Sequence, residues 1–84
     1  MCAEDIDARI RTSARRLREW RWMQTISTDL QDLLLQLRAE AKELIALGVK
    51  HPDRAKKLGK LLVAYHRLMI EVKDLEDKRQ GTLT

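Results

Sequence analysis

The sequence contains few residues that interrupt a helix or cross-link a chain. Among 84 residues there are one proline, three glycines and one cysteine, and phenylalanine is absent. A lone cysteine forms no disulfide within the chain, which is typical of a protein in a reducing compartment. Because proline and glycine are scarce, a helix has few places where it must stop. We therefore expect an all-α protein located in the cytoplasm.

Long apolar runs and catalytic motifs are also missing. No apolar run approaches the roughly 18 residues of a membrane-spanning helix, and Asp5 and Asp7 interrupt any signal-peptide core. His51 and His66 belong to no metal-ligand pattern, and no nucleophile, base and orienting residue stand at readable spacings. We predict no membrane attachment, no metal or cofactor and no enzymatic activity. A small enzyme whose arginines grip an anionic substrate is a third, competing hypothesis.

The residues that are present are typical of a small folded domain. Apolar residues make up 44% of the chain and charged residues 36%, a mixture that favours folding over disorder. A chain of this length forms one domain at most, and such chains often complete their core by oligomerising or docking on a partner. We expect a single helical domain over residues 1–84, completed by dimerisation or by a partner.

The stretch LGVKHPD, from Leu47 to Asp53, is the clearest interruption of the helical pattern. Gly48 suits the left-handed residue that ends a helix, and Pro52 suits the first turn of the next helix. Two helices that meet in so short a turn run antiparallel. We therefore predict helices over residues 28–47 and 52–79, followed by a frayed tail at 80–84.

Apolar spacing predicts the buried faces of these two helices. The stripe of the earlier helix contains one polar residue, Glu40. Its apolar members are Met23, Ile26, Leu30, Leu33, Leu37, Leu44 and Leu47, widened by Leu34, Ala41 and Ile45. Between Leu61 and Val72 the later helix is apolar around most of its circumference. That surplus predicts a central position in a bundle or a dimer interface.

A further helix is predicted over residues 3–22. One face of it carries four apolar side chains, Ile6, Ile10, Leu17 and Trp20. This register does not continue into the leucine stripe, and Thr28 with Gln31 fits a capping box that begins a new helix. We therefore predict a small bundle of three helices. One long bent helix that packs as a hairpin against residues 52–79 is the alternative.

Positive charge is concentrated in two blocks. The net charge is +4, with six arginines between Arg9 and Trp22 and five basic residues between Val49 and Lys60. Such blocks suggest an anionic partner, and nucleic-acid binding is the alternative function. Its candidate contacts are Arg11, Arg15, Arg18, Lys50, Arg54, Lys57 and Lys60. A solvated basic face, partly paired with Asp7 or Glu19, is the competing interpretation.

The stretch RRLREWRWMQ, from Arg15 to Gln24, holds both tryptophans of the chain. On a helix Trp20 and Trp22 point about 200° apart, so one core face does not take both. Trp20 shares the face of Leu17 and is expected to pack in the core. Trp22 either contacts a partner or closes the end of the bundle. The predicted partner-binding residues are Arg15, Arg18, Arg21 and Trp22.

Gly59 lies inside a predicted helix, where glycine costs up to about 1 kcal/mol relative to alanine. A close helix crossing would explain it, and the predicted self-association face is Gly59, Val63, His66 and Ile70. The sequence therefore predicts a non-enzymatic protein that binds another protein as an adaptor, inhibitor or small regulator and forms a homodimer. A basic nucleic-acid-binding regulator is the alternative.

Overall fold

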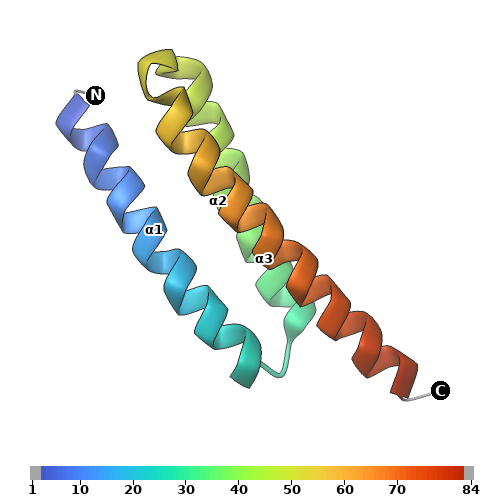
Figure 1. Cartoon of the computed structure of the whole chain (residues 1–84). Helices are drawn as coiled ribbons and strands as arrows, with labels where there is room; N and C mark the ends of the chain where they lie inside the picture. Colours follow the sequence, from blue (N-terminus) through green and yellow to red (C-terminus); the bar gives the residue numbers. More distant parts are fainter. Residues whose placement is uncertain (1–2, 83–84) are drawn as a thin grey trace.

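The structure, a computed structural model, describes residues 3–82 and is helical almost throughout. Helix α1 spans Ala3–Ile26, α2 spans Leu30–Lys50, a short 3₁₀ turn η1 spans Pro52–Arg54, and α3 spans Ala55–Thr82. The predicted all-α fold with three helices is confirmed. Figure 1 shows that α2 and α3 form an antiparallel hairpin and that α1 runs parallel to α3.

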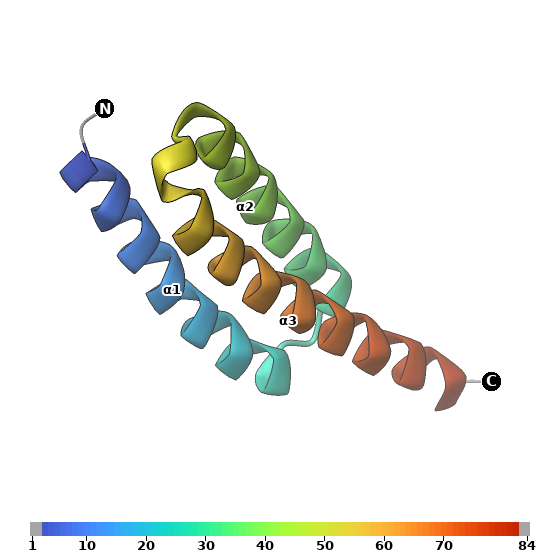
Figure 2. The same cartoon turned by 45° about the horizontal axis from the view of Figure 1, so that its top comes forward.

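The three helices form an elongated bundle rather than a sphere. Helix α3 lies between α1 and α2 in Figure 2 and contacts both. The molecule measures 51 × 19 × 16 Å and its radius of gyration is 14.4 Å. A compact domain of this length would have a radius of gyration of about 12 Å. The close packing of α2 against α3 leaves α1 as an outer layer on one side of the hairpin.

The core lies mainly between α2 and α3. Its largest buried cluster comprises Leu30, Leu33, Leu34, Leu37 and Leu44 of α2, Leu58, Leu61, Tyr65, Leu68 and Val72 of α3, and Leu17 of α1. The apolar stripes of α2 and α3 therefore predicted most of it. Ile45 was expected to widen the stripe, but its side chain is half-exposed.

The break between α1 and α2 occurs at residues 27–29. Helix α1 continues to Ile26, beyond the expected end near Trp22, and the Ser27 N–H donates to the Met23 carbonyl at 2.7 Å. The capping prediction for Thr28 was wrong. Asp29 is the N-cap of α2, and its Oδ1 accepts the Asp32 N–H at 2.9 Å. Because Asp29 directly precedes the first helical residue, its carboxylate reaches the free N–H groups of the first turn.

The turn between α2 and α3 does not use Gly48 as predicted. Helix α2 runs through Gly48 to Lys50, and no glycine of the described chain has a positive φ. Proline disfavours helical backbone at the residue before it, so His51, with φ −130° and ψ 73°, leaves the helix instead. The Arg54 N–H then donates to the His51 carbonyl at 3.0 Å and closes η1.

Helix α3 is 28 residues long and continues to Thr82, past the expected end at Arg79. Its C-terminal end extends beyond the other two helices in Figures 1 and 2. Of the tail expected to fray, residues 80–82 continue the helix, and residues 83–84 lie outside the described part of the chain. The length of α3 accounts for much of the elongated shape.

Candidate functional site

The arginines of α1 divide into two groups according to the helix face they occupy. Arg9 and Arg16 face α2, where Arg9 pairs with Glu43 and Arg16 Nη2 lies 2.6 Å from Glu40 Oε1. The remaining four are exposed: Arg11, Arg15, Arg18 and Arg21. Two arginines of α1 therefore attach this helix to α2, and the other four are exposed on its surface.

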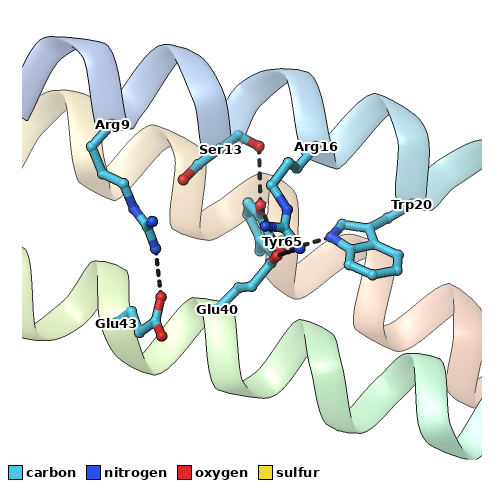
Figure 3. A network of polar contacts seen from close by, with 7 residues as sticks. All are labelled: Arg9, Ser13, Arg16, Trp20, Glu40, Glu43 and Tyr65. Atoms are coloured by element: carbon cyan, nitrogen blue, oxygen red, sulfur yellow. Dashed lines mark hydrogen bonds and ion pairs between the residues drawn. The ribbon is translucent and has the colours of Figure 1, made fainter.

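Glu40 is the centre of the contacts that fix α1, as Figure 3 shows. Its Oε2 accepts the Trp20 Nε1–H at 2.7 Å and lies 3.0 Å from the hydroxyl oxygen of Tyr65. That hydroxyl also lies 3.0 Å from the carbonyl oxygen of Ser13, so its one proton has two acceptors. The Arg16 guanidinium lies 5.6 Å from the centre of the Trp20 ring. We call Arg16, Trp20, Glu40, Tyr65 and the Ser13 carbonyl the Glu40 network.

The Tyr65 hydroxyl is held in its neutral form. Burial raises the pKa of Tyr65 above its ordinary value of 10.0, and the negative charge of Glu40 raises it further. The neutral phenol therefore remains a hydrogen-bond donor throughout the physiological pH range. Because the members of the Glu40 network bond to one another, their chemistry is that of a structural attachment between three helices.

The sequence interpretation did not identify the Glu40 network. It treated Glu40 as an interruption of the leucine stripe and assigned Trp20 to the core. Trp20 does pack against the core, but its N–H is bound to Glu40. The available signal was the carboxylate within an apolar stripe, because a buried charge requires a partner. Spacing along the chain did not reveal that the partners are 20 and 25 residues away.

On the outer face of α1, three predicted contacts lie together. Arg11, Arg15 and Arg18 line an open depression of about 420 Å³ with Ala14. None of these arginines forms an ion pair with a side chain that the structure describes. The partial pairing with Asp7 or Glu19 that belonged to the competing interpretation is not seen within residues 3–82, and the positive charge of the three arginines faces solvent.

The end of α1 carries an exposed apolar surface beside this depression. Trp22 is 65% exposed, Ile26 53% and Met23 37%, so Trp22 does not close the end of the bundle. The expectation that Met23 and Ile26 begin the buried stripe of α2 was also wrong, because both belong to α1. We call these three residues the apolar end of α1.

A trough of about 600 Å³ connects the two tryptophans. Its lining comprises Arg16, Arg18, Glu19, Trp20, Trp22 and Met23. Arg18 lines both this trough and the depression next to it, whereas Arg21 lines neither. The structure therefore joins Arg15, Arg18 and Trp22 in one outer surface and places Arg21 beside it.

The second basic block is partly used within the fold. Arg54 Nε lies 3.1 Å from Asp7 Oδ1, and Lys57 Nζ lies 3.9 Å from the same oxygen. Arg54 also approaches Asp53 at 3.4 Å. Lys50 and Lys60 are exposed. Two of the four predicted anion contacts in this block, Arg54 of η1 and Lys57 of α3, thus hold the start of α1 in place.

The predicted self-association residues lie on the outer side of α3. Val63 is 54% and Ile70 50% exposed, and His66 is exposed as well. A methyl group added at Gly59 would meet no described atom within 4 Å, so none of the helices between residues 3 and 82 crosses closely there. His66 and Ile70 also line a groove of about 280 Å³ between α2 and α3, together with Leu34, Arg38, Met69 and Lys73.

Two further properties concern residues 3–82. No helix in this range is apolar over enough length to cross a membrane. No three His, Cys, Asp or Glu side chains in the range lie in an arrangement that could hold a metal ion. No protein-family model, curated protein or solved structure matches the chain.

Proposed function

We propose that this protein is a small non-enzymatic adaptor, inhibitor or regulator that docks on another protein through the outer face of α1. The observation that carries the proposal is the apolar end of α1, which continues through Arg18 into an unpaired row of arginines. Tryptophan and arginine are the residues most enriched among those that dominate binding energy. The partner that fits presents an apolar pocket bordered by carboxylates.

Replacement of Trp22 by alanine tests this proposal. We expect the substitution to cost about 2 kcal/mol of binding energy, which is roughly a thirty-fold loss of affinity. Val49→Ala is the matched control, because Val49 is 77% exposed on α2. A partner is captured from the native host with the wild-type chain, and its affinity for each variant is measured by calorimetry. Unchanged affinity of a folded Trp22→Ala variant would overturn the proposal.

We also propose that the protein forms a homodimer through the self-association face of α3. The half-exposed Val63 and Ile70 support this, as does the open space at Gly59. In a monomer, Gly59→Ala should stabilise α3 by about 1 kcal/mol. In a dimer whose helices cross at Gly59, the added methyl group should weaken association. Sedimentation over a range of concentrations distinguishes these results, and a monomer at every concentration would contradict the dimer.

A further inference from the structure

The contacts of α1 with α3, and with η1 directly before it, place basic residues of α1 beside basic residues of α3. Asp7 pairs with Arg54, the Ser13 carbonyl contacts Tyr65, and Gln24 Nε2 donates to Glu71 Oε2 at 3.4 Å. The paired residues are 47, 52 and 47 positions apart in the chain. Because the two helices run parallel, residues 11–18 of α1 lie beside residues of about 58–70 in α3 (Figure 2).

These basic residues of α1 and α3 also border the same side of the bundle. One row on α3 follows helical spacing and comprises Lys57, Lys60, Ala64, Arg67 and Glu71. Its first member, Lys57, contacts Asp7 of α1, and its last member, Glu71, contacts Gln24 of α1. On α1, the same spacing connects Asp7 with Arg11 and Arg18. Lys60 and Arg67 are exposed. We call Arg11, Arg15, Arg18, Lys60 and Arg67 the cationic band.

Negative charge lies at the two ends of this band, in Asp7 and Glu71, rather than along it. Helix α3 has no acidic residue between Ala55 and Ile70, and α1 has only Glu19 between Ala8 and Arg21. Glu19 lines the trough with Met23 rather than the depression with Arg11 and Arg15. The carboxylates of Glu40 and Glu43, on α2, pair with Arg16 and Arg9. None of the five band residues forms an ion pair with a described side chain.

We infer that the cationic band binds the phosphate backbone of a nucleic acid. From Arg11 to Arg18 the helix rises about 10 Å, a length over which one strand of a duplex presents about three phosphates. Lys60 and Arg67 form a second row on the neighbouring helix, so the band contacts phosphates along a surface rather than at one point. A nucleic acid is the occupant that matches an extended, regularly spaced positive surface. The band shares Arg11, Arg15 and Arg18 with the face of α1 that is proposed to contact a protein, whereas Lys60 and Arg67 lie on α3 and belong to the nucleic-acid inference alone.

The test measures binding of labelled duplex and single-stranded oligonucleotides by fluorescence anisotropy at several salt concentrations. Five phosphate contacts predict that affinity for a duplex falls roughly 500-fold between 50 and 200 mM salt. The double variant Arg15→Gln/Lys60→Gln should reduce that fall to roughly 40-fold and weaken binding at low salt. Tighter binding of the single strand, with quenching of the fluorescence of Trp22 in a Trp20→Phe background, would identify single strands as the preferred form.

The matched control is Arg38→Gln/Lys42→Gln. Both residues are exposed on α2, and the double variant removes the same charge without touching the band. It should retain the wild-type salt dependence. Equal weakening by both double variants would show a net-charge effect and overturn the inference, as would undetectable binding. Equal displacement of the oligonucleotide by polyglutamate or anionic vesicles at the same charge concentration would also overturn it.

Discussion

The α2–α3 hairpin and helix α1 are held in place by different kinds of contact. Between α2 and α3 the interface is a continuous apolar layer in which Leu37, Leu68 and Val72 have no exposed surface. Helix α1 fully buries only Ile6, Ser13 and Leu17 among its described residues, and Ile10, Ala14 and Trp20 pack against the core while partly exposed. Its polar attachments are the Glu40 network, the ion pairs near its start and the hydrogen bond from Gln24 to Glu71. The hairpin therefore supplies most of the packing, and polar groups determine where α1 sits on it.

This difference determines which region is expected to open first. Apolar burial contributes roughly 25 cal/mol per Å², whereas an exposed ion pair contributes about 0–1 kcal/mol. A hydrogen bond between protein groups adds about 0.5–1.5 kcal/mol net. Helix α1 should thus be the least strongly held element. Both tryptophans are in α1, so their fluorescence reports on α1 while circular dichroism reports on all three helices.

The largest effect is expected from Leu37→Ala, which disrupts the hairpin itself. Leu37 has no exposed surface, and such a truncation costs about 2–5 kcal/mol. That is a large part of the stability of a small domain, so fluorescence and circular dichroism should both shift to lower urea. The control Leu35→Ala removes a side chain that is 57% exposed on the same helix, with an expected effect within about 0.5 kcal/mol. Similar losses for both variants would show that the hairpin core is not the main source of stability.

Tyr65→Phe tests the polar attachment of α1. The substitution leaves the ring in place but removes the hydroxyl that contacts Glu40 and the Ser13 carbonyl, at a cost of about 1–3 kcal/mol. In a Trp22→Phe background, where only Trp20 reports, the fluorescence transition should move to lower urea more than the circular dichroism transition. Equal shifts of the two transitions would contradict a separate loosening of α1.

A pH titration tests the same hydroxyl without altering the core. Because the pKa of Tyr65 is higher in the folded state than its ordinary value of 10.0, its contribution is complete below that pH and is lost as the pH rises above it. The free energy of unfolding should then fall by up to about 1.4 kcal/mol per pH unit. Tyr65 is the only tyrosine, so Tyr65→Phe should remove this component. Identical alkaline profiles for the two proteins would refute the assignment.

The smallest effect is expected from the ion pair between Arg9 and Glu43. Both side chains are largely exposed, at 42% and 64%, and such pairs contribute roughly 0.2–1 kcal/mol. A double-mutant cycle with Arg9→Gln and Glu43→Gln should give a coupling energy in this range that decreases with added salt. A salt-independent coupling energy above about 2 kcal/mol would contradict this prediction, because the pair would then hold α1 as strongly as the contacts of the Glu40 network.

Sequence patterns predicted the hairpin better than the attachment of α1. Leucine spacing in α2 and α3 predicted the buried faces, because residues three or four positions apart lie on one side of a helix and these two helices bury that side. Proline at position 52 predicted the turn, although His51 and not Gly48 ends α2. The candidate surface was predicted in part: Arg11, Arg15 and Arg18 share a face in the sequence and in the structure. Arg67 was not considered, because only the pairing of α1 with α3 brings it level with Arg18.

By itself, the sequence determined the all-α class, the faces that α2 and α3 bury, and the excess of arginine in α1. These follow from local spacing, chain-breaking residues and composition. Tertiary structure decided which arginines are neutralised by α2, which remain on the surface, and that Trp22 and Ile26 stay exposed. The physical reason is that the ion pairs and hydrogen bonds by which α1 contacts the other helices join residues 20 to 52 positions apart, and only the docking of whole helices brings them together.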